Sequence, residues 1–311
     1  MNVITQLPQF KTVPGPVVLA AGFFDGVHRG HQLVLAGAVE RARELAGQAW
    51  VLTFDRHPLA VLAPSKCPPL LCTLDERLAL LERAGVDGAL VLTFTRDMAV
   101  QSPESFVRWL CAEAVGGRLC EVRCGHNWRF GRRAEGTPEL LARLGQSAYG
   151  FRVVVVPYAD YQGLEVSSTR IRCAVREGRL DDAAAMLGRA YAVRGTVVRG
   201  RGIGRSLNAA TANVQPSTEV LPPNGVYAVR VQAGRTVCNG VANLGVHPTF
   251  VDDIPDRAVL ETHLLDFSGD LYGQAIEVAF LARLRDERVF ESPEALTRQI
   301  ADDVLQARRC F

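Results

Sequence analysis

Two histidines spaced three residues apart stand in a glycine-rich stretch near the start of the chain, residues 22–32, which read GFFDGVHRGHQ. An apolar run precedes this stretch and a helical pattern follows it, so His28 and His31 fall at a strand-to-helix turn and in the first helical turn. A helix start offers free N–H groups and a positive dipole end, which suit a phosphate. Imidazole donors placed there can stabilise the charge that grows on a reacting phosphorus atom. The alternative is a turn whose histidines only cap the helix.

A second cluster of phosphate-binding residue types follows at residues 166–178, VSSTRIRCAVREG. Ser167, Ser168 and Thr169 stand at another expected helix start, and Arg170 and Arg172 come close behind. Together they offer hydroxyls, backbone N–H groups and guanidinium forks to one anion. An ordinary Ser/Thr helix cap is the alternative. Two such clusters in the same half of the chain favour an enzyme that handles phosphates.

A third cluster, CEVRCGH at residues 120–126, contains Cys120, Cys124 and His126, which are residue types that bind metals. The spacing is not a tight C-x-x-C, and no second pair of ligands follows at the distance found in zinc fingers. The alternation of the run is typical of a strand. We therefore favour buried thiols over a zinc site here.

Composition narrows the class of protein. A chain of 311 residues with 48% hydrophobic and 22% charged residues predicts a globular protein of two domains, and a net charge of +2 is too small to indicate nucleic acid or a membrane surface as partner. Neither lysine, Lys11 or Lys66, lies in a Walker-type phosphate loop. No apolar run reaches about 20 residues, and the first residues lack the pattern of a signal peptide. A cytoplasmic location with reduced cysteines is therefore expected.

The two halves of the chain show different hydrophobic patterns. From residue 15 to about 190, short apolar runs alternate with helical stretches, which indicates a parallel sheet covered on both faces. The expected strands are residues 16–22, 50–54, 88–94, 119–125 and 151–157, and the expected helices are 31–47, 74–85 and 102–117, with a further helix start at Thr137-Pro138. Such sheets bind ligands at the carboxyl ends of their strands, where the histidine pair stands.

The second half predicts an antiparallel sheet or a small barrel. Residues 191–200, 224–232, 236–245, 258–267 and 275–284 are short alternating runs between clusters of Gly, Pro, Asn and Asp. Ser292-Pro293 marks the start of a final helix. The boundary between the halves is expected in residues 175–191, a helical connector that ends at Gly188.

Ten motifs in a fixed order resemble the signatures of bacterial bifunctional riboflavin kinase/FAD synthetases. The first half carries GFFDGVHRGHQ, TFDRHPLAVL, FTRDMA, CGHNWRFG and VSSTRIR; the second carries GRGIGRSLNAATANV, NGVYAV, GVANLGVHPTF, ETHLLDFSGDLYG and LRDERVFESPEAL. The resemblance implies an α/β fold: a Rossmann-like nucleotidyltransferase domain with a parallel sheet in residues 1–186, and a six-stranded antiparallel β-barrel with a terminal helix in residues 187–311. The first would adenylylate FMN to FAD and the second would phosphorylate riboflavin to FMN, both with ATP and Mg²⁺.

The resemblance also implies residue roles. It makes Glu261, His28 and His31 catalytic, Glu261 as the base of the kinase, and it makes Thr211 and Asn213 ligands of Mg²⁺. ATP and phosphate contacts are expected from Gly22, Phe23, Asp25, Gly30, Ser167, Ser168, Thr169, Arg172, Gly202 and Arg205. Flavin or substrate contacts are expected from His57, Pro58, Asn127 and Trp128. From the residues alone, Asp25 and His57 are equally compatible with turn capping or packing, and Glu261 with a solvated partner of an arginine.

Three residues depart from the family pattern. Ala210 replaces the usual proline of the kinase signature, Trp128 replaces a phenylalanine, and His126 stands where acidic or small polar residues are common. Loss of a proline gives the unfolded chain more conformational entropy and so lowers the stability of the folded protein by about 0.4–1 kcal/mol. It does not remove Thr211 or Asn213. Two alternatives stay open: an adenylyltransferase with a weakened kinase half, and a barrel that serves only as a nucleic-acid or ligand-binding module. Small molecules are the expected partners, with weak self-association left open.

Overall fold

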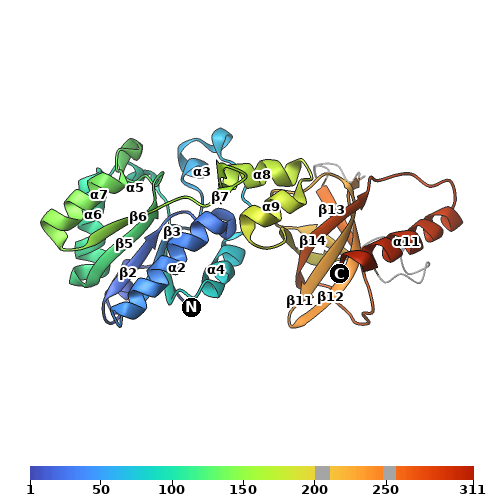
Figure 1. The fold of residues 1–311 in the computed structure, drawn as a ribbon, viewed down its shortest axis with the longest axis horizontal. Helices are drawn as coiled ribbons and strands as arrows, with labels where there is room; N and C mark the ends of the chain where they lie inside the picture. The colour runs from blue at the N-terminus through green and yellow to red at the C-terminus, as the bar shows by residue number, and fades with distance from the viewer. Residues whose placement is uncertain (200–210, 248–256) are drawn as a thin grey trace. The chain divides into compact units, whose positions relative to one another are not determined.

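The computed structural model describes residues 1–199, 211–247 and 257–311, and the chain divides into two compact units, Met1–Ser168 and Thr169–Phe311 (Figure 1). Gly202, Arg205 and Ala210, which the sequence analysis singled out, lie outside the described residues. No helix in the described part of the chain is long and apolar enough to cross a membrane.

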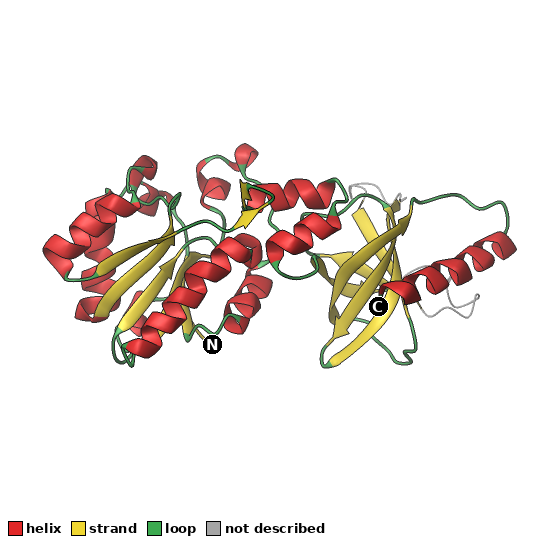
Figure 2. Cartoon of the chain, in the orientation of Figure 1, coloured by secondary structure: helices red, strands yellow, loops and turns green. Residues whose placement is uncertain are grey.

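A parallel sheet of six strands, in the order β1-β4-β3-β2-β5-β6, forms the centre of the first unit (Figure 2). The strands are β1 (Asn2–Ile4), β2 (Val17–Ala21), β3 (Gln48–Phe54), β4 (Gly88–Leu92), β5 (Leu119–Gly125) and β6 (Arg152–Val156). Every neighbouring pair is parallel. The predicted parallel sheet is therefore confirmed, and β1 is an additional edge strand that is too short to show a hydrophobic pattern.

Helices cover both faces of this sheet. One face packs against α2 (Arg29–Glu44) and α4 (Leu74–Arg83), whose apolar stripes include Leu35 and Leu81. The other face packs against α1 (Leu7–Phe10), α6 (Pro103–Trp109) and α7 (Pro138–Leu144). The short helices α3 (Pro58–Leu62) and α5 (Arg96–Ala99) follow β3 and β4. The predicted caps of α6 and α7 are confirmed, because Ser102 and Thr137 accept hydrogen bonds from backbone N–H groups of the first helical turn.

A hairpin and two helices follow β6. Strands β7 (Asp160–Tyr161) and β8 (Leu164–Glu165) form the hairpin, and α8 (Ser168–Arg176) and α9 (Leu180–Leu187) come after it. Gly188 ends α9 in the left-handed region with φ of 74°, which favours glycine. This matches the predicted end of the helical connector.

The second unit contains a closed barrel of six antiparallel strands in the order β10-β13-β12-β11-β14-β9. The strands are β9 (Ala192–Val198), β10 (Thr211–Pro216), β11 (Gly225–Ala233), β12 (Thr236–His247), β13 (Arg257–Leu264) and β14 (Ala275–Arg285). The barrel that the resemblance implied is confirmed. Strand β10 was not among the runs predicted from the hydrophobic pattern.

Alternate residues of the barrel strands face inward and outward. Ala212, Leu244, Leu260 and Thr262 are buried and belong to the inward-facing set. The intervening residues of β10, β12 and β13 are half-buried and lie on the outer face: Thr211, Asn213, Asn243, Glu261 and His263. The polar residues expected to carry the kinase chemistry are therefore all on the outside of the barrel wall.

The final helix, α11 (Pro293–Ala307), packs on the outer face of the barrel against β11, β12 and β14. Ser292 caps its start, as predicted, by accepting from the N–H of Ala295. Asp303 is buried in α11, and its carboxylate accepts two hydrogen bonds from Arg285 at the end of β14. Nε of Arg285 donates to Oδ1 at 2.9 Å, and Nη2 donates to Oδ2 at 2.7 Å. This bidentate ion pair fixes the helix on the barrel.

Candidate active sites

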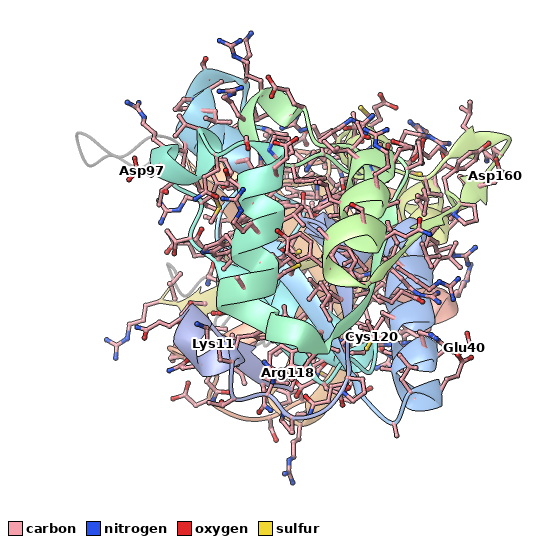
Figure 3. All side chains as sticks on the ribbon, turned by 90° about the vertical axis from the view of Figure 1, so that its left-hand side faces the viewer. Lys11, Glu40, Asp97, Arg118, Cys120 and Asp160 are labelled. Carbon is pink, nitrogen blue, oxygen red and sulfur yellow. The ribbon has the colours of Figure 1, made fainter. Side chains whose placement is uncertain are left out.

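The carboxyl edge of the parallel sheet brings together several of the predicted site segments. In the sheet, β3 and then β4 lie on one side of β2, whereas β5 and then β6 lie on its other side. The strand order therefore reverses at β2. This is where open parallel sheets bind ligands. Residues 22–31 follow β2, residues 55–58 follow β3 and residues 126–130 follow β5. In Figure 3, Asp97 and Asp160 mark this edge, and Arg118 and Cys120 lie at the opposite one.

The loop between β2 and α2 has an unusual backbone. It contains the short helix η1 (Asp25–Val27), and Phe24, Gly26 and Val27 have φ of 59°, 74° and 40°. Positive φ is costly for bulky and β-branched residues, about 1–3 kcal/mol each. Such strain persists only where the surroundings hold it, and it is concentrated at functional sites.

Asp25 is one of the groups that hold this loop. Its carboxylate is buried and accepts hydrogen bonds from the N–H groups of Leu71, at 3.0 and 3.1 Å, and Cys72, at 3.3 Å. The N–H of Gly26 donates to Sγ of Cys72 at 3.2 Å. Burial raises the pKa of the Cys72 thiol to about 12. Asp25 thus has a structural role in the loop, and its contact with a phosphate stays a prediction.

His28 and His31 stack on each other at the N-terminus of α2, with ring centroids 3.6 Å apart. Nδ1 of His28 accepts from the N–H of His31 at 3.4 Å and so caps the helix. Nδ1 of His31 is buried and has no hydrogen-bond partner in the described structure. Burial, followed by the electrostatic interactions with His28 and Arg77, holds the pKa of His31 well below its ordinary value. Capping thus accounts for His28 but not for His31.

Ser168, the first residue of α8, joins the second predicted anion site to this loop. Its hydroxyl donates to the carbonyl of Asp25 at 3.0 Å. A Cβ on Gly30 would lie 3.2 Å from the His28 ring and 3.7 Å from the carbonyl of Val166, so glycine permits this close approach. Farther along α8, Thr169 is exposed and Arg172 is buried. Ser167 is half-buried just before the helix.

The predicted residues after β3 are capping residues in the structure. Nδ1 of His57 accepts from the N–H of Leu59 at 3.1 Å, and Pro58 is the first residue of α3. The ring of His57 also contacts Phe23, with centroids 4.9 Å apart. The carbonyl of Phe23 accepts from Oγ1 of Thr53 at 3.0 Å, and Gly22 donates its N–H to the carbonyl of Leu52 at 3.1 Å.

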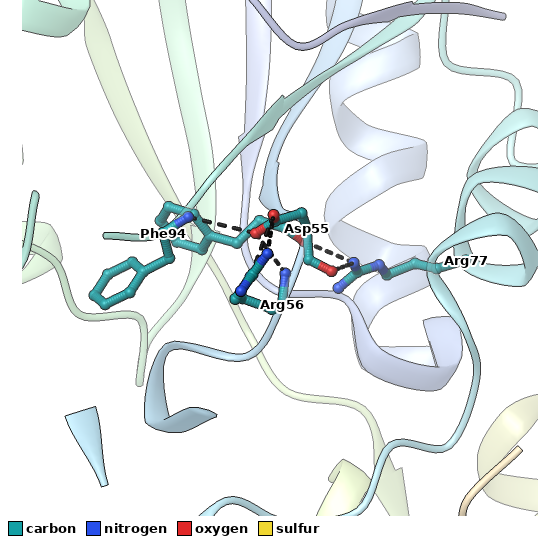
Figure 4. A network of polar contacts seen from close by, with 5 residues as sticks. Asp55, Arg56, Arg77 and Phe94 are labelled. Carbon is teal, nitrogen blue, oxygen red and sulfur yellow. Dashed lines mark hydrogen bonds and ion pairs between the residues drawn. The ribbon is translucent and has the colours of Figure 1, made fainter. Parts of the chain in front are cut away.

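Arg77 lies in the same region and was not predicted. Its Nη1 donates to the carbonyl of Phe23 at 2.8 Å and its Nη2 to the carbonyl of Phe54 at 2.6 Å. Figure 4 shows this guanidinium beside Asp55, whose backbone carbonyl also accepts from Nη2 of Arg77, at 3.5 Å. The carboxylate of Asp55 accepts from Arg56 and from the N–H of Phe94. One signal in the sequence was available: Arg77 is spaced three residues after Leu74 and four before Leu81, on the apolar stripe of its helix.

The segment after β5 presents aromatic and amide groups. Asn127 is exposed, and Trp128 is half-buried and stacked on Phe130 at a centroid distance of 4.8 Å. His126 lies 3.6 Å from a carboxylate oxygen of Glu165 in β8. Cys124, in contrast, is fully buried, and burial raises its pKa to about 12. Of the three residues weighed as zinc ligands, Cys124 is thus a core thiol.

The barrel wall brings together the residues predicted for kinase chemistry. Asn213 of β10 and Asn243 of β12 are the two register partners of Glu261 in β13. Thr211 of β10 pairs with His263, which lies two residues after Glu261 in β13. Residues separated by nearly fifty positions in the sequence therefore become direct neighbours on one face.

Asn243 was not assigned a role from the sequence. Its Nδ2 donates to Glu287 at 3.1 Å, and its Oδ1 is buried without a partner in the described structure. Glu287 also lies close to Gly245, where a Cβ would meet its carboxylate at 2.2 Å. Asn243 and Glu287 thus extend the polar face around Glu261.

Comparison with known proteins assigns a family to each half of the chain. The sequence profile of the FAD synthetase family matches residues 11–170, and that of the riboflavin kinase family matches residues 187–311. Bifunctional riboflavin kinase/FMN adenylyltransferases from Escherichia coli K12 and Pseudomonas fluorescens are each 38% identical, over 94% and 99% of this chain and 92% and 97% of their own length. The Bacillus subtilis protein of the same description is 34% identical over 94% of this chain and 92% of its own length.

One solved structure shares the fold over its whole length. It is described as a macrolide-efflux protein from Streptococcus pneumoniae, has a TM-score of 0.86 and 29% identity, and covers 99% of both chains. Fold and family matches together define an ATP-dependent transferase with an adenylyltransferase domain and a kinase barrel. The chain belongs to the bifunctional riboflavin kinase/FMN adenylyltransferases: it phosphorylates riboflavin to FMN and adenylylates FMN to FAD.

Proposed function

We propose that adenylyl transfer takes place over the loop between β2 and α2. The observation that carries this proposal is the stacked pair His28 and His31 at the N-terminus of α2, where a buried imidazole nitrogen has no partner. The loop also receives Ser168 from the start of α8. Helix N-termini and imidazole N–H groups are the donors that a triphosphate needs.

In this assignment the phosphate of FMN attacks the α-phosphorus of ATP and pyrophosphate leaves. The protein supplies position and hydrogen bonds to the phosphates, with no covalent intermediate on a side chain. Because its pKa is held low, His31 donates a hydrogen bond as a neutral imidazole. Gly22, Phe23, Gly30, Ser167, Thr169 and Arg172 remain predicted ATP contacts, and His57, Pro58, Asn127 and Trp128 remain predicted flavin contacts.

Substitution of the histidines tests this placement. His28→Ala or His31→Ala should slow FAD formation from FMN by about 10²–10³-fold, the effect of removing one donor to a transition-state oxyanion. Riboflavin phosphorylation by the same chains should stay normal. The matched control is His126→Ala, a solvent-exposed histidine after β5. Normal FAD formation in folded His31→Ala would show that the reaction takes place elsewhere.

For the kinase reaction we assign the general base to Glu261. The ribityl hydroxyl of riboflavin attacks the γ-phosphorus of ATP, and a positioned carboxylate can take its proton. The register places Glu261 beside Asn213 and close to Thr211, so base and oxygen ligands occupy one face of the barrel. Asn243, on the other side of Glu261, offers an additional oxygen atom.

These residues fit Mg²⁺, which prefers oxygen ligands and binds through few protein groups together with substrate phosphates. Thr211 and Asn213 would hold the ion. The Oδ1 atom of Asn243 has no hydrogen-bond partner among the described residues and is an additional oxygen atom on this face. When bound, the ion neutralises charge on the phosphates.

We assign adenylyl transfer to residues 1–186 and phosphoryl transfer to residues 187–311, in agreement with the ranges of the two family matches. A reducing, cytoplasmic location is supported by the eight cysteines, all of which are free thiols. Small molecules as the sole ligands are supported by the barrel aromatics: Tyr227 and Phe280, the aromatic residues of its described strands, are buried and offer no platform for bases. Weak self-association stays a prediction.

A further inference from the structure

Arg77 connects the ends of two strands at the carboxyl edge of the parallel sheet. It is 2% exposed and lies in α4, on the side of the helix that faces the sheet. Its guanidinium donates to the carbonyl of Phe23, just after β2, and to the carbonyl of Phe54, the last residue of β3. Its Cζ also lies 4.3 Å from the centroid of the Phe23 ring. One side chain therefore connects both strand ends. Figure 4 shows its guanidinium on the side of β3, beside Asp55.

The charge of Arg77 has no direct counter-charge. No carboxylate of the described residues lies within ion-pair distance of its guanidinium, and its buried Nε has no partner. The two nearest acidic groups are engaged elsewhere: Asp25 with the N–H groups of Leu71 and Cys72, and Asp55 with Arg56 and Phe94. Within the described part of the chain, the charge of Arg77 is compensated only by backbone carbonyl oxygens and by the more distant charges of Asp25 and Asp55. A buried charge without a direct ion pair is costly, so an anionic ligand at this edge would supply the counter-charge that Arg77 lacks.

The strained loop gives the second reason to assign a function to Arg77. Phe24 and Val27 adopt positive φ, and the loop begins at the carbonyl that Arg77 holds. The loop ends at His28, which caps α2 and stacks on His31. A shift of the end of β2 would therefore also move the imidazoles of His28 and His31.

We infer that Arg77 is a positioning residue for adenylyl transfer, which fixes the loop of residues 22–28 and places a buried positive charge that the triphosphate of ATP compensates. This inference rests on the proposed placement of adenylyl transfer at this edge. The guanidinium fork performs the positioning, because it reaches two carbonyls at once. The positive charge of Arg77 raises the affinity for ATP, because it attracts the negatively charged triphosphate.

Two substitutions separate these effects. Arg77→Met removes fork and charge, and it should lower kcat for FMN adenylylation by about 10²-fold and raise KM for ATP by about tenfold. Arg77→Lys keeps the charge without the planar fork, so KM for ATP should return to within about twofold of the wild type while kcat stays reduced. Arg83→Met, at the exposed C-terminal end of the same helix, is the matched control and should change neither constant.

Folding of the variants can be followed in the relevant unit alone. The protein has three tryptophans, Trp50, Trp109 and Trp128, and all of them lie within residues 1–168. Tryptophan fluorescence during urea unfolding therefore reports on this unit. The kinase rate of each variant, which should be unchanged, reports on the barrel.

Three results would overturn the inference: normal kcat and KM in Arg77→Met, a loss of activity that only parallels unfolding of the unit, or an equal rise of KM for ATP in the Lys and Met variants. If adenylyl transfer does not take place over the loop between β2 and α2, the activities of the His31→Ala and Arg77→Met variants differ from these results. If His31→Ala forms FAD normally, the site is elsewhere; if His31→Ala is impaired and Arg77→Met is not, only the role of Arg77 is wrong.

Discussion

At the scale of single residues, the environment of His31 has a consequence for stability. The imidazole faces the ring of His28, the ring of Phe24 at 5.2 Å and the charge of Arg77. Burial first, and then the electrostatic interactions with His28 and Arg77, lower the pKa of His31 in the folded protein. In the unfolded chain the same group titrates near its ordinary value of about 6.5. The unfolded state therefore binds the proton more readily.

We expect the first unit to lose stability as the pH falls below about 6.5. Where the unfolded state binds one proton more than the folded state, stability falls by at most about 1.4 kcal/mol per pH unit. Urea unfolding between pH 7.5 and 5, followed by tryptophan fluorescence, should show a steeper loss in the wild type than in His31→Gln. The same change at exposed His126 should leave the slope unaltered. Equal slopes in wild type and His31→Gln would contradict a buried, neutral His31.

The sequence was sufficient to predict where the candidate site residues lie in the fold, but not how each is held. His28, His31 and Ser168 were expected at helix starts, and that is where they lie. Arg77 was missed because a charged residue in an amphipathic helix is normally assigned to the solvent face, although its spacing from Leu74 and Leu81 places it on the apolar stripe, and the packed sheet buries it there. The unpartnered Oδ1 of Asn243 is likewise visible only in the folded barrel.

At the scale of elements, the loop between β2 and α2 depends on Asp25. Asp25→Asn replaces one acceptor oxygen by an amide group that faces the N–H groups of Leu71 and Cys72. Loss of hydrogen bonds to a buried charged group should destabilise the first unit by about 1–3 kcal/mol. FAD formation should fall at least about tenfold, because the loop carries the histidines. Riboflavin phosphorylation should not change.

The matched control for this loop is Asp160→Asn in the hairpin of β7 and β8. Asp160 also accepts a backbone hydrogen bond, from Gly163, but it is exposed. Its substitution should change stability by less than about 0.5 kcal/mol. If urea unfolding shows the same small effect for Asp25→Asn, then Asp25 does not hold the loop.

Most elements followed from the hydrophobic pattern, and the exceptions have physical reasons. The strands β2, β3 and β4 are buried and nearly continuous apolar runs, which are easy to recognise. β5 alternates, and the edge strand β6 is apolar but only partly buried. β10, TANVQP, is short and ends in proline, and its alternation of small and polar residues resembles a loop. β1 spans only Asn2–Ile4 and owes its strand conformation to pairing with β4.

At the scale of the whole molecule, we assign the two reactions to separate sets of residues. The parallel-sheet unit contains the stacked histidines, and the barrel contains Glu261 with Thr211 and Asn213. FMN is the product of one reaction and the substrate of the other. A chain defective at one site should therefore cooperate with a chain defective at the other, provided that FMN leaves the barrel and reaches a second molecule.

The most direct measurement supplies riboflavin and Mg-ATP to His31→Ala, to Glu261→Gln and to an equimolar mixture, with FMN and FAD separated by chromatography. His31→Ala should accumulate FMN, because only adenylylation is slowed, by about 10²–10³-fold. Glu261→Gln should form FMN about 10²–10⁴-fold more slowly but adenylylate added FMN at the normal rate. The mixture should form FAD from riboflavin at a rate that approaches half that of the wild type at the same total concentration. Loss of both activities in either folded variant, or a mixture no better than its parts, would contradict the division of the two reactions between these sites.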